Sequence, residues 1–337
     1  MPSNKFLIII FSFLLFSCKN EISKEVKHPL TVFEFLSLEE ARKAVVQDSI
    51  ENYFEKVNML EMSIQMKMPK VVDNREELLK KYKKYIQDDI EAFNENDLKI
   101  LETQFTKALD QCKKLFPNLK LPKIKLLKTR GNYYGKSVYY TRENMIVIPT
   151  KQIREDNETL LKTLMHEIFH IYSRYNRDKR NDLYALIGYK KIENLELSEF
   201  LKRRIIYNPD GVDISYSIQL KDSVGNNFSA IPCIYSKYGS YKNISILDGH
   251  IFQLFEVRKT AKNKWQVVSD DVGLGEESLN GYWEQIGRNT SYTIHPDEIL
   301  ADNFSLILLS EENSNVLNKL DEGGKLLLKK ITTVIKE

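Results

Sequence analysis

The pentad His-Glu-Ile-Phe-His at positions 166–170 is the part of this sequence with the clearest chemistry. The apolar periodicity around it predicts a helix, and four residues make slightly more than one helical turn, so His166 and His170 project from the same face. Two histidines so spaced can chelate one zinc ion, and Glu167 between them can act as a base toward a water molecule. A chance pentad is expected in well under about one chain in a hundred of this length. The pattern therefore predicts a zinc site.

A catalytic zinc ion usually takes a third protein ligand. A third histidine in the extended pentad pattern is absent, because Ser173 and Asn176 stand where glycine and histidine would be. Further along, Glu298 and Asp302 lie four residues apart in a helix that Pro296 is expected to start, so they share one face. The competing acidic candidates, which have no such partner carboxylate, are Asp178, Asp182, Glu193 and Glu196.

An H-E-x-x-H helix followed by an E-x-x-x-D helix resembles the gluzincin metallopeptidases, the thermolysin-like clan of zincins. The resemblance covers these two short segments and implies that Glu298 binds Zn²⁺ while Asp302 accepts a hydrogen bond from His166 and orients it. Acidic residues in a first helical turn also favour the helix dipole, which explains Asp297 and Glu298 well but Asp302 poorly. The stretch between His170 and Glu298 is longer than is usual in the family, and a β insert must account for it.

The same resemblance implies a peptidase mechanism. Glu167 would take the proton of a zinc-activated water and pass it to the leaving amine. The developing oxyanion needs a further donor, for which Tyr282, Tyr292 and His295 are candidates, although each can equally be structural. A hairpin expected at residues 136–148 lies where the zincin sheet has the edge strand that pairs with an extended substrate.

The first seventeen residues indicate a secretory signal. Lys5 supplies a positive end, and the apolar run 6–16 is too short to span a bilayer. The Ser17-Cys18 pair that follows resembles the lipobox of bacterial lipoproteins, which implies cleavage before Cys18 and a lipid on its sulfur. The alternative is an ordinary signal peptide that ends near a cysteine. With the lipid, the protein would be anchored in the bacterial cell envelope, outside the cytoplasm, without a spanning helix.

Composition excludes some classes of protein. Lysine and arginine number 50 against 47 acidic residues, and no basic stripe interleaved with aromatic residues is present, so no nucleic-acid partner is expected. Besides Cys18, only Cys112 and Cys233 occur. They either form one disulfide or stay free, and the second is favoured because one lies in a helical pattern and the other in a strand pattern. Oligomeric state is not indicated.

We expect an α+β fold with a zincin-like catalytic domain. Its expected parts are a signal peptide (1–17), a lipid-anchored tether (18–35), a helical N-terminal region (36–120), a catalytic upper part with a small sheet and the H-E-x-x-H helix (121–204), an antiparallel β insert (205–268), and a glycine-rich loop with C-terminal helices that carry the third ligand (269–337). Helices are predicted at 37–62, 78–93, 96–116, from Asp156 or Asn157 to 174, at 182–187, 295–309 and 316–335. Strands are predicted at 124–127, 136–140 and 145–148, with a hairpin turn at Asp248-Gly249.

The functional hypothesis is a zinc-dependent peptidase that acts on a peptide or protein substrate. One rival is a lipoprotein that keeps the zincin frame but binds a partner without cutting it; an intact Glu167 argues against this. The other rival is a structural protein with an accidental pentad. Convergence of His166, His170 and Glu298 within about 2.0–2.2 Å of one ion position would separate the zinc site from that accident.

Overall fold

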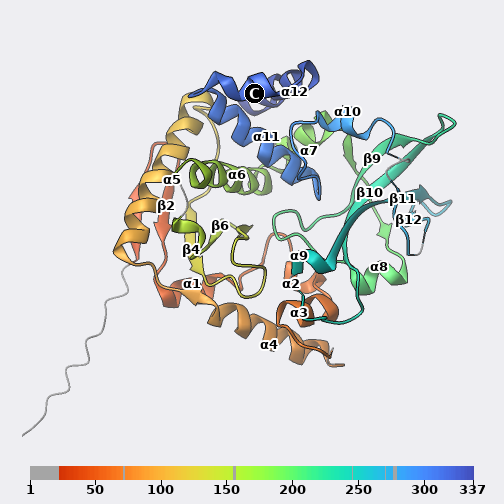
Figure 1. The fold of residues 1–337 in the computed structure, drawn as a ribbon, viewed down its shortest axis with the longest axis horizontal. Helices are drawn as coiled ribbons and strands as arrows, with labels where there is room; N and C mark the ends of the chain where they lie inside the picture. Colours follow the sequence, from red (N-terminus) through yellow and green to blue (C-terminus); the bar gives the residue numbers. More distant parts are fainter. Residues whose placement is uncertain (1–22, 71–72, 155–156, 245, 270, 276–278) are drawn as a thin grey trace, which may run out of the picture.

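Two β-sheets and the helices packed on them make up the described chain, which comprises residues 23–70, 73–154, 157–244, 246–269, 271–275 and 279–337 of a computed structural model (Figure 1). The predicted α+β class is confirmed. The predicted signal sequence, Cys18 and Asp156 lie outside the described residues. Among the helices that are described, none has the length and apolar composition needed to cross a bilayer.

Sheet A, formed by β1 to β6, supports the pentad helix. Its strands are β1 (Lys24–Lys27), β2 (Val32–Phe35), β3 (Ile90–Glu91), β4 (Ile124–Thr129), β5 (Tyr140–Arg142) and β6 (Met145–Pro149). The order is β1-β2-β4-β6-β5, with β3 beside β4. Strands β2, β4 and β6 are parallel, whereas β5 pairs antiparallel with β6 at the edge of the sheet. The predicted hairpin therefore exists, but its first strand begins at Tyr140 rather than at residue 136.

The prediction of a tether for residues 18–35 is wrong for its second half. Residues 24–27 and 32–35 form the antiparallel pair β1–β2, and β2 joins the sheet beside β4. Phe33 and Phe35 are completely buried in the core. Two phenylalanines that alternate with other residues present one apolar face, which is a strand pattern and favours a place in the sheet over a solvated linker.

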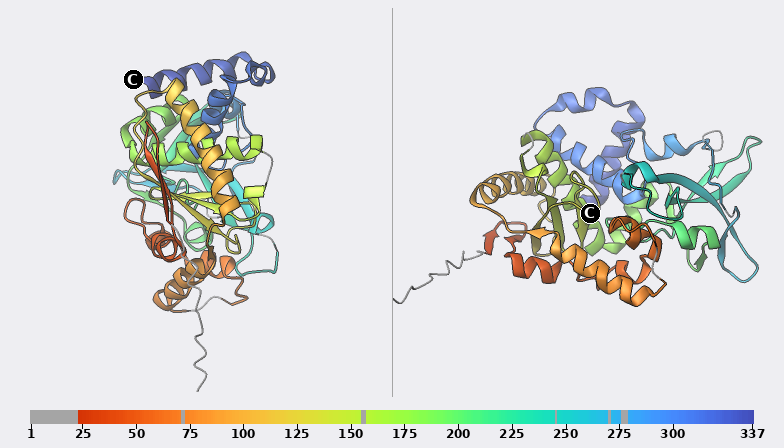
Figure 2. Two further views of the ribbon diagram at one scale, coloured as in Figure 1. Left: turned by 90° about the vertical axis from the view of Figure 1, so that its left-hand side faces the viewer. Right: turned by 60° about the horizontal axis from the view of Figure 1, so that its bottom comes forward.

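Helices cover both faces of sheet A. Helices α5 (Glu95–Leu115) and α6 (Asn157–Tyr175) pack in one core with Ile124 and Leu126 of β4, whereas Leu127 faces the opposite core. That second core contains helices α1 (Leu38–Ala44), α2 (Tyr53–Lys56), α3 (Met59–Gln65) and α4 (Arg75–Asp88). These helices come forward in the right-hand view of Figure 2.

The single helix predicted at 37–62 is wrong, because three short helices occupy that stretch and its continuation. The predicted capping box at Ser37 and Glu40 is present. After Ala44 the chain turns, and side-chain carboxylates accept hydrogen bonds that backbone carbonyls would accept in a helix. Asp48 accepts the Phe54 N–H at 2.6 Å, and Glu143 accepts the Ile50 N–H at 2.8 Å. Glu143 lies in the distant β5–β6 turn, so local periodicity could not predict this break.

Three of the other predicted helices are confirmed, and the rest differ in length. The helices near 96–116, 157–174 and 295–309 are confirmed as α5, α6 and α11 (Pro296–Ser310). Asn74 caps α4, which ends at Asp88 instead of 93 because β3 follows. The helix predicted at 182–187 is longer and forms α7 (Arg177–Leu186). The glycine-rich loop near residue 280 contains the short helix α10 (Tyr282–Ile286). The predicted last helix is divided into a 3₁₀ turn (Ser314–Lys319) and α12 (Glu322–Lys336).

Sheet B, formed by β7 to β12, contains the predicted β insert. Its strands are β7 (Tyr189–Lys191), β8 (Leu195–Glu196), β9 (Tyr216–Lys221), β10 (Asn227–Ser236), β11 (His250–Lys259) and β12 (Trp265–Val267). Their order in the sheet is β7-β9-β10-β11-β12-β8. Helix α8 (Glu199–Arg204) packs beside β10. The sheet thus begins before residue 205, and its β12–β8 pair is parallel. The predicted turn at Asp248-Gly249 is wrong: α9 (Ile246–Gly249) occupies it, inside the longer β10–β11 connection. Cys112 and Cys233 are buried free thiols, as favoured.

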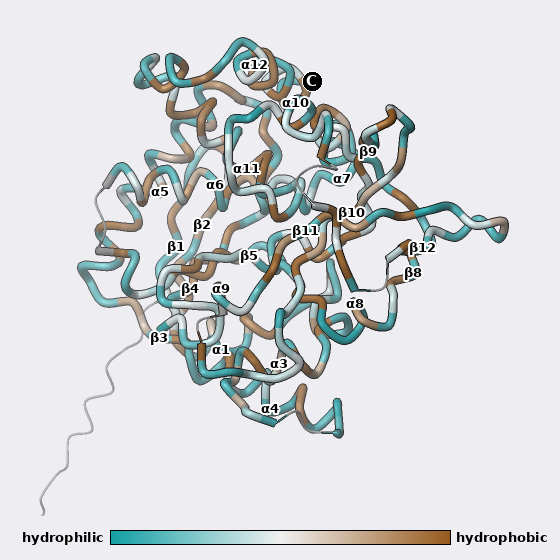
Figure 3. The backbone as a smooth tube through the Cα atoms, turned by 45° about the vertical axis from the view of Figure 1, so that its right-hand side comes forward, coloured by the Kyte–Doolittle hydropathy of each residue, from teal (hydrophilic) through white to brown (hydrophobic). Residues whose placement is uncertain are grey.

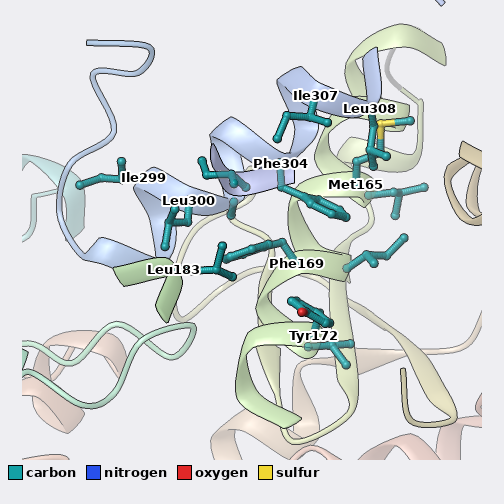
Figure 4. Packing of buried hydrophobic residues seen from close by; sticks show 14 of the residues in the cluster. Met165, Phe169, Tyr172, Leu183, Ile299, Leu300, Phe304, Ile307 and Leu308 are labelled. Carbon is teal, nitrogen blue, oxygen red and sulfur yellow. The ribbon is translucent and has the colours of Figure 1, made fainter. Parts of the chain in front are cut away.

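Apolar packing between α6 and α11 positions the candidate site. Phe169 of α6 lies against Phe304 of α11, with ring centroids 5.5 Å apart, and Leu300 and Leu308 belong to the same core (Figure 4). Hydrophobic residues gather along the central strands, whereas α4 at the outside is largely hydrophilic (Figure 3). The two helices that carry the predicted ligands are therefore fixed against each other by a dry interface.

This interface gives a stability prediction. The substitution Phe169→Ala should lower the free energy of unfolding by about 3–5 kcal/mol, because it leaves a cavity between fully buried rings. Chemical denaturation of the metal-free protein measures this loss. The matched control is Leu326→Ala on α12, whose side chain is 52% exposed, and it should cost less than about 1 kcal/mol. Equal losses in the two variants would contradict the assigned packing.

Candidate metal centre

The pentad helix α6 presents its two histidines on one side and its apolar residues on the other. Leu164, Ile168 and Ile171 are fully buried in the core that includes α5 and α11. His170 is also buried, and the His166 side chain is only 13% exposed. Their rings lie edge to face with centroids 4.7 Å apart. The helical period therefore places both imidazoles together, in a site largely screened from solvent.

Glu298, from the first turn of α11, lies between the two imidazoles. Its Oε2 atom is 3.0 Å from His166 Nε2 and 3.4 Å from His170 Nε2. All three possible ligand atoms lie within 4.8 Å of one another. In a tetrahedral zinc site with bonds of about 2.0–2.1 Å, neighbouring ligand atoms are separated by about 3.3 Å. The Nε2–Oε2 separations are close to this spacing, so the three side chains form one group that could hold a metal ion.

A carboxylate from α11 orients each histidine. His166 Nδ1 lies 3.0 Å from Asp302 Oδ1, and His170 Nδ1 lies 2.7 Å from Asp297 Oδ2. With Nδ1 donating to a carboxylate, each Nε2 atom faces Glu298: in the metal-free site a protonated Nε2 of His166 donates to Glu298 Oε2, and loss of that proton would free a lone pair for a cation. The structure thus brings Asp302 to the position that the family resemblance implies.

Asp297 is a further residue of the candidate site, which its sequence pattern does not predict. Its place in a first helical turn fits the helix dipole, yet its carboxylate also accepts hydrogen bonds from Ser173 Oγ at 2.5 Å and from the Tyr184 hydroxyl at 2.7 Å. These donors hold it firmly against His170. The available signal was its place next to Glu298, since successive residues of a helix lie about 100° apart and can face two different histidines.

Glu167 points into the same site but is not one of the three grouped ligands. It is buried, and its Oε2 atom has no hydrogen-bond partner among the described residues. Burial and the nearby charge of Asp210 raise the pKa of Glu167 to about 8, although the two histidines act in the opposite direction. In the metal-free site this carboxyl is therefore mostly protonated at neutral pH, whereas a cation bound beside it would lower the pKa and leave the carboxylate free to act as a base.

The site contains more acid than base. Two imidazoles face a larger set of carboxylates that are all buried or nearly so: Glu167, Asp210, Asp297, Glu298 and Asp302. Although burial lowers it, hydrogen bonds to Asp302 and Glu298 raise the pKa of His166 to about 9. In the metal-free site, protons on the imidazoles therefore balance part of the negative charge. A divalent cation would do so better, because unpaired buried charge is costly, and the two nitrogen and one oxygen donors fit zinc.

Of the other predicted candidates, only Tyr292 lies at the site, and the remaining donors and third ligands lie elsewhere. Tyr292 lies at the site, with its ring centroid 6.4 Å from that of His166. His295 instead caps α11: its Nδ1 accepts the Asp297 N–H, and its Nε2 donates to the Asp213 carbonyl. Tyr282 is buried in the core at the start of α10. The competing third ligands lie on α7 or near β7 and β8, mostly exposed to solvent: Asp178, Asp182, Glu193 and Glu196.

Two further residues of the site come from the segment between α8 and β9. Asn208 Nδ2 donates to Glu298 Oε1 at 2.5 Å. Asp210 can group with Glu167 and His170, since their polar atoms lie within 4.8 Å of one another. Sequence reasoning missed both, because an Asn-Pro-Asp-Gly stretch predicts only a turn, and nothing local indicates which distant helix that turn meets.

Comparisons of the chain with protein-family models, with curated proteins and with solved structures gave no match. The arrangement of the site's donors, its buried charge and the position of Glu167 are the observations that bear on its function.

The contact between Asp297 and His170 can be tested by metal affinity. The Asp297→Asn variant should bind zinc about 10–100-fold more weakly, because the imidazole loses the anion that raises its basicity. Competition with a chelator at neutral pH measures the change. Ser173→Ala is the matched control, since it removes one donor to Asp297 but keeps the anion, and it should lose less. Unchanged zinc affinity in Asp297→Asn would show that this carboxylate does not serve the metal.

The raised pKa of His166 predicts a pH dependence. In the metal-free protein, its ion pairs contribute stability that is complete below about pH 6.5 and is lost as the pH rises toward about 9. The melting temperature of the metal-free protein should therefore fall across this window. Buffered zinc should cancel the fall, because the cation replaces the lost protons.

Differential scanning fluorimetry at pH 6.5 and pH 9, with and without zinc, checks this. The His166→Gln variant lacks the titrating imidazole, so its metal-free melting temperature should depend less on pH. A wild-type protein whose melting temperature is the same at both pH values, or is unaffected by zinc at pH 9, would be inconsistent with the assigned charge balance.

Proposed function

We propose that this protein is a zinc-dependent peptidase of gluzincin type, which hydrolyses peptide bonds of a peptide or protein substrate. The observation that carries the proposal is the position of Glu298 Oε2, at 3.0 and 3.4 Å from the Nε2 atoms of His166 and His170. A cluster of this composition, with a glutamate beside it that is not a ligand, is what metal-assisted hydrolysis requires.

The architecture supports a zincin-like catalytic frame. Strand β6 leads into the pentad helix α6, antiparallel β5 forms the adjacent edge of sheet A, and α11 returns after sheet B to bring the third acid. Sheet B lies between α7 and α11 in the sequence, so it is an insertion between the two ligand-bearing helices. Such an insertion is tolerated when both of its ends return to the same place.

In the proposed mechanism, His166, His170 and Glu298 hold zinc. When bound, the ion would acidify a water molecule and polarise the scissile carbonyl. Glu167, with its unpartnered Oε2, accepts the proton of the attacking water and delivers it to the leaving amine. Asp297 and Asp302 keep the imidazoles in one tautomer throughout.

Tyr292 is the best placed of the candidate transition-state donors. Partial burial and the charges of Glu298, Asp210 and Glu167 raise the pKa of its hydroxyl well above the usual value. The phenol therefore remains protonated at neutral pH and can donate a hydrogen bond to a developing oxyanion. Its ring is 45% exposed, which leaves room for a small change of rotamer when substrate arrives.

We further propose that the enzyme acts in the bacterial cell envelope, held by a lipid on Cys18. The support is the sequence around Ser17-Cys18 together with the position of the first described strand, β1, only a few residues later. A short linker of this kind would keep the catalytic part close to the membrane surface.

A second candidate function is a lipoprotein that binds a partner without cutting it. One observation favours it: the outward N–H of Thr141 on edge strand β5, where a substrate would pair, already donates to Asp210 at 2.5 Å. The intact Glu167 favours the enzyme, because a binding protein has no chemical need for an unpaired buried carboxylate.

The Glu167→Gln variant separates the two functions. It should bind zinc as the wild type does but lose at least about a hundredfold of its turnover on a mixed peptide library, because the base is removed while the ligands remain. Metal analysis and mass spectrometry of the products measure the two properties. Glu158→Gln, an exposed position on the same helix, is the matched control and should keep full activity. If Glu167→Gln cleaves peptides as fast as the wild type, or if the wild type binds no zinc, the proposed function is wrong.

A further inference from the structure

The segment Tyr207–Val212 forms a tight turn that contacts both α6 and edge strand β5. The Asp210 N–H donates to Asn208 Oδ1 at 3.1 Å, and the Gly211 N–H donates to the Asn208 carbonyl at 3.2 Å. Pro209 and Asp210 therefore stand at the tip of the turn. The tip faces the candidate metal centre, because Asn208 contacts Glu298 and Asp210 approaches Glu167 and His170.

The turn is held from several sides. Arg174, one helical turn after His170 on α6, donates to the carbonyls of Pro209 at 3.2 Å and Asp210 at 3.5 Å. Gly211 packs so closely against His295 that a Cβ atom at position 211 would lie 2.2 Å from His295 Nδ1. Only glycine fits there. The turn is thus held against α6 and against the start of α11, the two helices that carry the candidate ligands.

The turn also occupies the contacts that a peptide would need. Asp210 Oδ1 accepts hydrogen bonds from the Thr141 N–H at 2.5 Å and from Thr141 Oγ1 at 2.6 Å. On an edge strand, a substrate carbonyl would accept that same N–H. Asn208 engages the third predicted ligand, Glu298, and the Asp210 carboxylate stands next to the predicted base. A substrate could not reach these groups while the turn stays in place.

We propose that the segment Tyr207–Val212 is an internal plug that imitates a bound peptide, with the carboxylate of Asp210 directed at the metal position as an additional ligand. The inference rests on the proposed function and adds regulation to it: the closed turn lowers the turnover of the enzyme, and full activity appears only when the turn withdraws. Two buried atoms support a ligand in this position, since Glu167 Oε2 has no partner and His170 Nε2 meets Glu298 only at 3.4 Å. The Asp210 carboxylate comes from outside the two ligand helices and groups with His170, which also belongs to the group with His166 and Glu298, so it approaches the same position.

Binding of metal-directed probes to the zinc-loaded full chain tests the plug. Acetohydroxamate needs only the metal, whereas a dipeptidyl hydroxamate also needs the edge of β5. The Asp210→Ala variant should bind the dipeptidyl probe at least about tenfold more tightly than the wild type, because the closed state no longer competes with it. Its affinity for acetohydroxamate should rise too, since a competing ligand has been removed. Isothermal titration calorimetry measures both affinities.

A second readout and a matched control accompany this test. In the cobalt-substituted protein, the visible absorption bands should differ between wild type and Asp210→Ala, because a carboxylate ligand is exchanged for water. The control is Asp213→Asn in the same loop, whose carboxylate pairs with Lys191 away from the metal position, and it should behave as the wild type. Should Asp210→Ala fail to fold, Asn208→Ala, which removes the contacts with Glu298 and with the Asp210 N–H and so loosens the turn, should also bind the dipeptidyl probe more tightly than the wild type.

The outcomes distinguish the plug from the enzyme. If zinc binds and the dipeptidyl probe has equal affinity for wild type, Asp210→Ala and Asn208→Ala, the plug is refuted while the metal site stands. If the wild type binds neither zinc nor cobalt, the proposed function and the plug fall together. Tighter probe binding in the Asp210→Ala and Asn208→Ala variants, with Asp213→Asn unchanged, supports the plug.

Discussion

The dry contact between α6 and α11 is the constraint on which the site depends. Phe169 and Phe304 pack at its centre, and the same two helices turn imidazoles and carboxylates toward each other just beyond it. Because a packed core resists small displacements, it holds ligands from distant parts of the chain at metal-binding distance. The apolar interface thus fixes the distance between the ligands of α6 and those of α11, which a long polypeptide connection alone could not fix.

Burying several carboxylates on the polar side of this contact costs free energy, which explains why hydrogen-bond donors and imidazoles surround them. Buried carboxylates outnumber the two imidazoles, and several have specific partners: Asp297 is bound by Ser173 and Tyr184, and Asp302 by Thr290. Glu298 shares the two histidines and Asn208. Such a network is stable only when charge is balanced, which links the occupancy of the site to protons or to a cation. The turn that carries Asp210 brings a further carboxylate to this position and so increases the need for a balancing proton or cation.

Local periodicity was sufficient to predict α5, α6 and α11, and with them the shared face of His166 and His170 and that of Glu298 and Asp302. It failed where distant groups decide the structure. Glu143 ends the first helical stretch from another element, and β1 and β2 are strands because sheet A accepts them. Asn208 and Asp210 reach the site through a long β insert, and no spacing in the sequence records that return.

The most direct test of the central claim is anomalous diffraction from a crystal of the zinc-loaded protein. The account predicts one zinc peak within about 2.0–2.2 Å of the Nε2 atoms of His166 and His170 and of a Glu298 carboxylate oxygen. A zinc ion coordinated elsewhere, or a Glu298 side chain turned away from the two imidazoles with no other acid in its place, would contradict it.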